Sequence, residues 1–195
     1  MIVLLAMLLQ AQDIALDNEF VRVTRNAAPC AAAGPACQDR VIVALGEIEL
    51  RTGSTRRKLV RGDIAVFAPG ESYDVSAGSF FEVAIKPGHP PLPAPSEYIP
   101  PALNVVRHES DRLFIFEERL EVGETRARHS HRPRVVIQLN RTRLQQWPDG
   151  APEIIRDIVP DQAGFNPPVV HTVRNVGELP LRGIVIELKA GSPRG

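Results

Sequence analysis

Three histidines in this chain have the spacing of a metal-binding set. His129 and His131 flank a single serine, and His171 follows 40 residues later. Side chains two positions apart on a β-strand point to the same face, so His129 and His131 can direct both imidazoles at one point. A third imidazole from a later strand would complete a nitrogen-ligand cluster that transition metals accept. The histidines therefore predict a divalent transition-metal site, with Fe, Zn, Mn, Ni and Cu left open as its occupant.

The segments around these histidines have the composition of short β-strands. They are rich in β-branched and aromatic residues and bounded by turn residues, with 18 prolines and 14 glycines in the chain. The strand-like stretches are residues 41–50, 62–70, 80–86, 112–122, 134–147 and 181–189. Sustained helical periodicity is missing beyond the first twelve residues. The sequence therefore predicts an all-β protein, built as an antiparallel barrel or jelly roll.

A weak internal repeat divides the chain into two halves. Val41–Leu45 matches Val135–Leu139 at an offset of 94 residues, and Phe20–Val23 matches Phe114–Glu117 at the same offset. Further on the offset becomes 98, where Asp63, Phe67, Pro69, Tyr73 and Val75 pair with Asp161, Phe165, Pro167, His171 and Val173. The repeat predicts one barrel over residues 13–88 and another over 102–190. A proline-rich linker, 89–101, joins them, and 191–195 form a tail.

The histidine segments resemble a known family. Gly123–His131 resembles the first cupin motif, a glycine followed after five residues by His-x-His. Gly164–Asn175 resembles the second, in which His171 and Asn175 keep the His-x3-Asn spacing. The chain as a whole resembles a bicupin. The resemblance implies two tandem cupin-type jelly-roll β-barrels, with the metal site in the C-terminal one.

The chain departs from the cupin pattern at the fourth ligand. Cupins normally place a glutamate shortly after the His-x-His pair, where this chain has Val135 and Val136. Strand alternation counted from Val135 would point Gln138 to the opposite face. The resemblance then implies a site of three neutral imidazoles with open coordination positions, as in some thiol and diketone dioxygenases that use Fe(II). In the first repeat Pro35, Cys37 and Tyr73 stand at the three histidine positions, so we expect no metal there.

Candidate ligand-binding residues surround the histidines. Arg128 and Arg134 could bind a substrate carboxylate, with a solvent-facing strand edge as the alternative interpretation. Gln138 and Trp147 are further candidates for contact with a small-molecule ligand, and core packing is the alternative for Trp147. A metal enzyme should also hold the second nitrogen of each imidazole. The polar residues available for this are Glu117, Glu118, Glu121, Asn175 and Glu187.

Two classes of function stay open at this point. One is a metal-dependent enzyme, foremost a dioxygenase, which would bind substrate and O₂ at open metal positions. The other is a non-catalytic cupin that binds a small molecule or serves a structural role. The 23 basic and 23 acidic residues give a formal net charge of +0, which favours neither nucleic acid nor an anionic membrane as a partner. A homodimer is compatible with either class.

The N-terminal region predicts export. Residues 1–12 are typical of the apolar part of a signal peptide and too short to span a bilayer, although a buried first strand is the alternative. Cys30 and Cys37 are the two cysteines of the chain. In an oxidising compartment they would form a disulfide that closes a short loop. We therefore expect a secreted or periplasmic protein.

Overall fold

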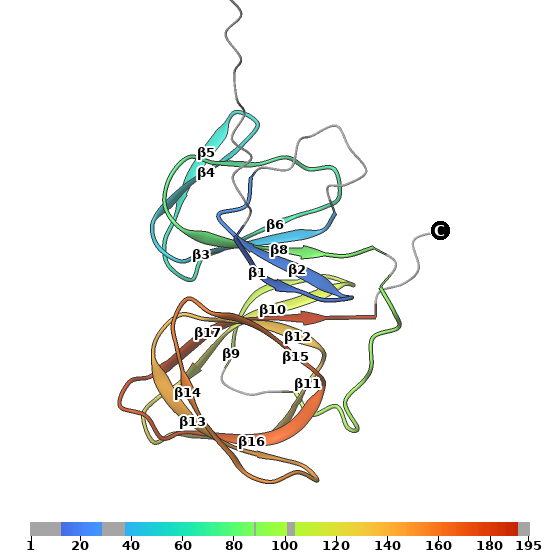
Figure 1. Ribbon diagram of the computed structural model, residues 1–195, viewed down its shortest axis with the longest axis vertical. Coiled ribbons are helices and arrows are strands. Elements are labelled where there is room, and N and C mark those ends of the chain that lie inside the picture. The colour runs from blue at the N-terminus through green and yellow to red at the C-terminus, as the bar shows by residue number, and fades with distance from the viewer. Residues whose placement is uncertain (1–12, 29–37, 88, 101–103, 191–195) are drawn as a thin grey trace, which may run out of the picture.

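The computed structural model describes residues 13–28, 38–87, 89–100 and 104–190 (Figure 1). Within these ranges the regular structure consists of β-strands, and there is no helix long and apolar enough to cross a membrane. The predicted leader 1–12, the pair Cys30 and Cys37, and the tail 191–195 lie outside the described residues.

The first half of the chain forms two facing sheets. The strands are β1 (Asp13–Asp17), β2 (Val21–Arg25), β3 (Arg40–Ala44), β4 (Ile48–Thr52), β5 (Thr55–Leu59), β6 (Ile64–Phe67), β7 (Asp74–Val75) and β8 (Phe80–Ile85). One sheet has the order β1-β2-β8-β3-β6, and the other has the order β5-β4-β7. An apolar cluster that includes Ile42, Leu50 and Phe67 fills the space between them.

The second half repeats this arrangement. Its strands are β9 (Asn104–Glu109), β10 (Leu113–Leu120), β11 (Thr125–His131), β12 (Arg134–Gln138), β13 (Thr142–Pro148), β14 (Ile154–Ile158), β15 (Ala163–Asn166), β16 (Val169–Asn175) and β17 (Leu181–Leu188). The sheets have the orders β15-β12-β17-β10-β9 and β11-β16-β13-β14. Strand by strand, the five-stranded sheet matches that of the first half, and β3 and β12 lie 94 residues apart. The predicted pair of tandem jelly-roll barrels is confirmed.

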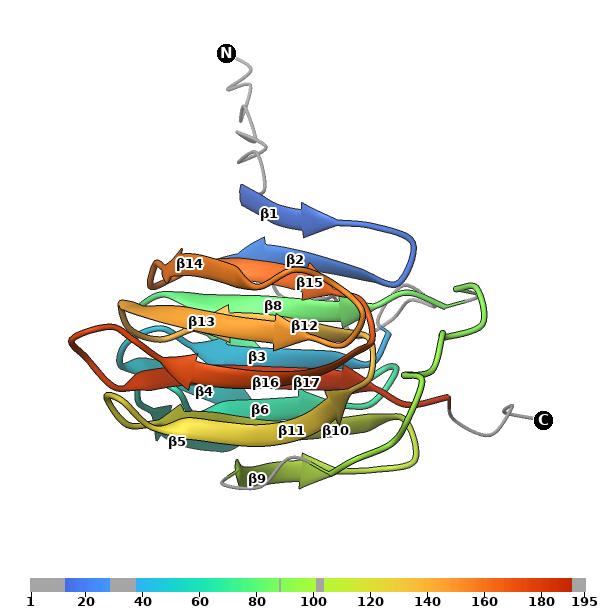
Figure 2. The same cartoon turned by 90° about the horizontal axis from the view of Figure 1, so that it is seen from below.

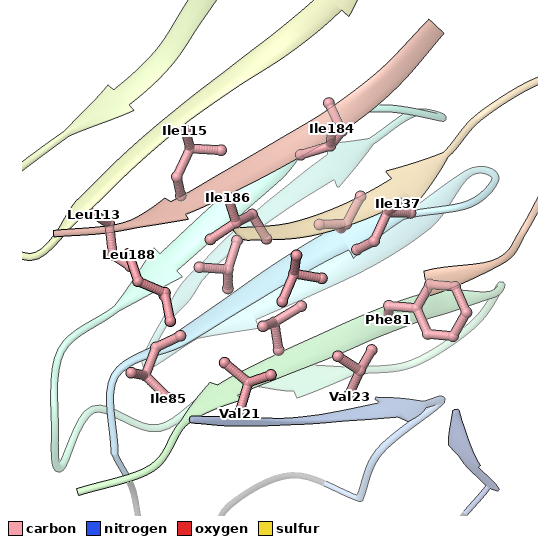
Figure 3. Packing of buried hydrophobic residues seen from close by; sticks show 14 of the residues in the cluster. Val21, Val23, Phe81, Ile85, Leu113, Ile115, Ile137, Ile184, Ile186 and Leu188 are labelled. Carbon is pink, nitrogen blue, oxygen red and sulfur yellow. The ribbon is translucent and has the colours of Figure 1, made fainter. Parts of the chain in front are cut away.

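The largest apolar cluster lies between the two barrels (Figure 3). Each five-stranded sheet has one face inside its own barrel and packs its other face against the sheet of the neighbouring barrel (Figures 1 and 2). The first barrel contributes Val21, Val23, Phe81 and Ile85, and the second contributes Leu113, Ile115, Ile137, Ile184, Ile186 and Leu188. Strands buried on both faces need apolar residues at nearly every position, which explains the continuous apolar runs of β3, β12 and β17.

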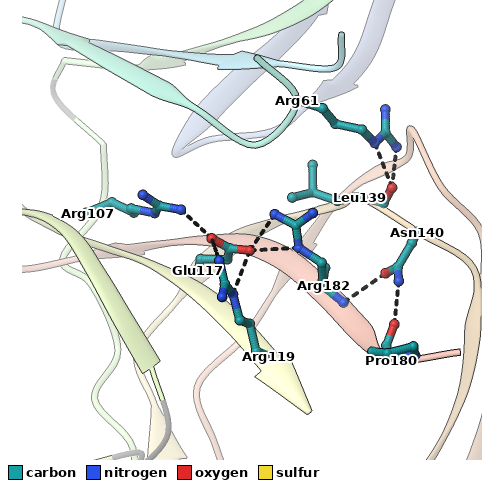
Figure 4. A network of polar contacts seen from close by, with 8 residues as sticks. All are labelled: Arg61, Arg107, Glu117, Arg119, Leu139, Asn140, Pro180 and Arg182. Atoms are coloured by element: carbon teal, nitrogen blue, oxygen red, sulfur yellow. Dashed lines mark hydrogen bonds and ion pairs between the residues drawn. The ribbon is translucent and has the colours of Figure 1, made fainter. Parts of the chain in front are cut away.

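A buried carboxylate organises the polar rim of this interface (Figure 4). Glu117 on β10 is fully buried and forms ion pairs with Arg107, Arg119 and Arg182. Burial alone would raise the pKa of Glu117. Hydrogen bonds from the three arginines outweigh burial and lower that pKa to about 2. Nearby, Arg61 of the first barrel donates to the carbonyl of Leu139 in the second, at 2.9 Å from its Nε.

Candidate metal centre

The structure brings His129, His131 and His171 together inside the second barrel. Strands β11 and β16 are antiparallel neighbours, and His129 lies directly opposite His171. One ring nitrogen from each histidine lies within 4.8 Å of the other two, and all three side chains are buried. Such a set of nitrogens could hold a metal ion.

A β-bulge determines which residues of β11 face the interior. Arg126 pairs with Val173 and His129 pairs with His171, so Ala127 and Arg128 together lie opposite one residue of β16. The extra residue changes the alternation of the strand. Arg126 and the two histidines are thereby buried, whereas Arg128 turns outward and forms ion pairs with Glu97 and Asp149.

Hydrogen bonds at Nδ1 leave the Nε2 atoms of two histidines facing each other. Nδ1 of His129 lies 2.8 Å from the carbonyl oxygen of Ala127, and Nδ1 of His131 lies 2.7 Å from Oε1 of Glu187. Because a carbonyl and a carboxylate accept, each Nδ1 is assigned the proton and each Nε2 keeps a lone pair. The two Nε2 atoms are 3.0 Å apart, close to the roughly 3.3 Å separation of neighbouring nitrogens around zinc.

His171 supplies a buried nitrogen without a partner. Its Nε2 is inaccessible to solvent and has no hydrogen-bond partner among the described residues. A buried polar atom without a partner carries a desolvation cost, and metal coordination would remove that cost. The residues present therefore fit a metal ion held by three imidazole nitrogens.

Burial keeps all three imidazoles neutral. It lowers the pKa of His129 and His131, and it lowers the pKa of His171 to about 2, to which the two neighbouring histidines also contribute. Neutral imidazole is the form that binds metals. The contact between His131 and Glu187 is therefore a hydrogen bond from a neutral ring rather than an ion pair. Burial raises the pKa of Glu187 to about 7, against the opposing effect of Arg134 and Arg132.

The position expected for a cupin glutamate is occupied by Val136. Val136 packs inside the barrel against Phe116 and Val185, whereas Val135 lies in the apolar cluster between the barrels. The interpretation that counted alternation from Val135, and so pointed Gln138 away from the site, was wrong. Arg134, Val136 and Gln138 share the inner face of β12, because Val135 and Ile137 point to the first barrel.

The predicted ligand-binding residues separate into two pairs. Arg134 and Gln138 lie in the barrel that holds the histidines, and Nη1 of Arg134 donates to the carbonyl of Pro167 at 2.9 Å. Arg128 is on the outer surface with its two carboxylate partners. Trp147 is also directed outward from β13, and its Nε1 donates to Glu153 at 2.9 Å. The structure therefore does not bring Arg128 and Trp147 to the histidines.

Of the five polar residues proposed to hold an imidazole, Glu187 does so. Asn175 instead connects Thr142 Oγ1 with the carbonyl of Leu120. Among the others, Glu118 pairs with Arg126, Glu117 lies at the interface between the barrels, and Glu121 is exposed. Sequence reasoning missed Arg156, which is close enough to lower the pKa of His171. The only indication in the sequence was that Arg156 lies two residues before Ile158, so that both side chains point to the same face of β14.

A segment of the linker lies against the strand that carries His129 and His131. Between these histidines, Ser130 points outward and is buried. Its Oγ accepts from the backbone nitrogen of Ile99 at 2.8 Å, and its own backbone nitrogen donates to the carbonyl of Ile99 at 2.9 Å. Arg132 stacks its guanidinium over the ring of Tyr98 at 4.5 Å. The linker therefore covers the free edge of β11.

The equivalent region of the first barrel is built differently. Tyr73, which aligns with His171, stacks on Phe67, and its hydroxyl contacts the carboxylate of Glu82. Burial raises the pKa of Tyr73. Arg40 pairs across the sheet with Ala84, whereas its counterpart Arg134 pairs with Glu187. The first barrel thus has a methyl group where the second has the carboxylate that holds His131.

No family model and no curated protein matches this chain. Solved structures do match over most of its length. A cupin 2 conserved barrel domain protein from Leptotrichia buccalis is 14% identical with a TM-score of 0.55, covering 92% of this chain and 88% of its own. AerE from Microcystis aeruginosa is 13% identical with a TM-score of 0.57, covering 91% of both chains.

The structure of an enzyme also matches over most of this chain. Oxalate decarboxylase from Lactobacillus farciminis, solved as a formate complex, is 9% identical with a TM-score of 0.59 and covers 90% of this chain and 78% of its own. At these identities the likeness establishes the fold. The chain has the cupin fold, and its two consecutive barrels give it the bicupin form.

Proposed function

We propose that this protein binds one divalent transition-metal ion through His129, His131 and His171 in its second barrel. The observation that carries the proposal is the buried Nε2 of His171, which has no partner among the described residues and lies with the other two imidazoles. Two of the rings are oriented through Nδ1 by Ala127 and Glu187, so that Nε2 is available to a metal. The geometry supports the ligand set without selecting the metal.

Three neutral imidazoles leave the charge of the metal uncompensated and several coordination positions open. A metal held in this way can act as a Lewis acid toward a small molecule that binds at those positions. An Fe(II)-dependent dioxygenase is the second candidate, because the ligand set of three nitrogens leaves room for both a substrate and O₂.

Metal analysis of protein purified without a histidine tag tests the proposal. We expect about one first-row transition-metal ion per chain in the wild type and its loss in His131→Ala. His108→Ala is the matched control, because His108 lies on β9 outside the cluster and its removal should leave the metal content unchanged. Equal metal content in the wild type and His131→Ala would refute the metal site. The alternative would then be a non-catalytic cupin that binds small molecules without metal.

Export and the disulfide form a separate part of the proposal. The apolar residues 1–12 and the presence of two cysteines, Cys30 and Cys37, support secretion or a periplasmic location. Protein recovered from the periplasm or medium should lack the leader and resist alkylation until it is reduced. Two free thiols in that material would refute the disulfide.

A further inference from the structure

Residues 97–99 of the linker, here called the strap, lie along the edge of β11. Glu97 forms an ion pair with Arg128 at 2.9 Å. The backbone nitrogen of Ile99 donates to Oγ of Ser130 at 2.8 Å, and its carbonyl accepts from the backbone nitrogen of Ser130 at 2.9 Å. These contacts use the residues of β11 that alternate with the two histidines of that strand. The strap and the proposed metal ion therefore lie on opposite faces of the same short segment.

Arg132, the residue that follows β11, connects the strap with the interior of the barrel. Its guanidinium carbon lies 4.5 Å from the centre of the Tyr98 ring, and its Nη1 lies 3.5 Å from a carboxylate oxygen, Oε2 of Glu187. The other oxygen of that carboxylate, Oε1, accepts from Nδ1 of His131 at 2.7 Å. Tyr98 is therefore connected to a proposed metal ligand through three successive contacts.

The burial of these side chains shows which of them the strap can restrain. The side chain of Glu187 is 2% exposed, that of Arg132 is 29% exposed, and Tyr98 lies at the surface with 52% of its area exposed. A guanidinium that stacks on an aromatic ring gains a cation–π contact and loses conformational freedom. The ring of Tyr98 thereby favours the position of Arg132 from which the guanidinium can pair with Glu187.

We propose that Tyr98 and Arg132 are positioning residues for the metal centre, and that docking of the strap regulates metal affinity. The proposal rests on the proposed function, because it needs His131 as a metal ligand. With the strap docked, Tyr98 holds Arg132 against Glu187, and Glu187 fixes the ring of His131 with its Nε2 available to the metal. With the strap released, the carboxylate loses one of its two anchors and metal binding weakens. Coupling between two binding events is reciprocal, so bound metal stabilises the docked strap by the same factor.

Competition for Zn²⁺ between the full-length protein and a chromophoric chelator measures the effect on affinity. For Arg132→Ala and Tyr98→Ala we expect a loss of about 3- to 10-fold, below the 10- to 100-fold typical of a group that touches the metal ligand itself. Tyr98→Phe should keep the wild-type affinity, because the ring that stacks on the guanidinium remains. Ser96→Ala is the control, at an exposed position of the linker beside the strap. Equal melting temperatures of the chelator-treated proteins exclude a general loss of stability.

Limited digestion with chymotrypsin measures docking of the strap from the other side. Chymotrypsin cleaves after Tyr98, and the amide nitrogen of that peptide bond is the one through which Ile99 donates to Ser130. Cleavage therefore follows the population of the released strap when release is fast. Zn²⁺ should slow cleavage after Tyr98 by about the same 3- to 10-fold, relative to chelator-treated protein. In Arg132→Ala this protection by Zn²⁺ should disappear, because the connection between the strap and Glu187 is lost.

The outcomes separate the role of the strap from the metal site. Weaker Zn²⁺ binding in Tyr98→Ala but not in Tyr98→Phe, together with Zn²⁺ protection that requires Arg132, supports the proposal. Suppose instead that the wild type binds Zn²⁺ and Arg132→Ala binds it equally well, or that cleavage after Tyr98 has the same rate with and without Zn²⁺. Either result overturns the role of the strap and leaves the metal site standing. A wild type that binds no Zn²⁺ overturns the proposed function, and the regulation by the strap with it.

Discussion

Removing the carboxylate behind His131 should weaken metal binding without emptying the site. Glu187 is buried, and its Oε1 lies 2.7 Å from Nδ1 of His131. Loss of such a partner typically lowers metal affinity 10- to 100-fold. The lower end applies here, because His129 is held by the backbone carbonyl of Ala127, which no side-chain substitution removes. For Glu187→Ala we therefore expect a loss of roughly 10- to 30-fold, about 1.4–2 kcal/mol.

Competition with a chromophoric chelator measures this change directly. Glu187→Gln should show a smaller loss than Glu187→Ala, because its amide oxygen can accept the same N–H but carries no charge. Glu109→Ala removes an exposed carboxylate paired with Lys189 and should leave the affinity unchanged. A folded Glu187→Ala protein with wild-type affinity would refute the reasoning that Glu187 orients His131.

Three other predictions follow from the geometry of the barrels. Val136→Glu should tighten metal binding, because the new carboxylate points into the barrel and adds a ligand. Val135→Glu should instead lower the melting temperature, because it buries a charge between the barrels. Tighter metal binding in Val135→Glu would contradict this assignment of the two faces. The pKa of Glu117 is lowered in the folded protein, so ionised Glu117 stabilises the fold fully at pH values above the ordinary glutamate pKa of 4.5. This stabilisation is lost as the pH falls toward about 2. Urea unfolding should show Glu117→Gln about 2 kcal/mol less stable than wild type at pH 6 and closer to it at pH 2.5, and parallel pH curves would refute this. Ser130→Ala removes the hydroxyl that accepts from Ile99 and should loosen the linker there. We expect faster limited proteolysis at the linker and a metal affinity that is a few-fold weaker. Unchanged proteolysis would argue against the contact.

The architecture could be predicted because the same pattern occurs twice. Val41–Leu45 and Val135–Leu139 align in sequence, and the strands they overlap, β3 and β12, occupy the same place in equivalent sheets. Their continuous apolar runs reflect sheets that are covered on both faces. The sequence did not indicate that the second covering layer is the neighbouring barrel, because an apolar run has the same appearance whatever packs on it.

The details of the site were less predictable for two physical reasons. On β12 both faces are buried, so hydrophobicity could not show that Val136 rather than Val135 faces the histidines. On β11 the bulge interrupts the alternation, so counting back from His129 did not reveal that Arg126 points into the barrel. The histidine pair itself follows the bulge, which is why its simple two-residue spacing was informative.

A crystal structure with anomalous data at the absorption edge of the bound metal tests the central claim most directly. The account predicts one strong peak in the second barrel, about 2.0–2.2 Å from an Nε2 atom of each of His129, His131 and His171. An anomalous peak at another place in the protein would contradict the account. So would the absence of a peak in protein crystallised with a stoichiometric transition metal, with the three imidazoles bonded to water instead.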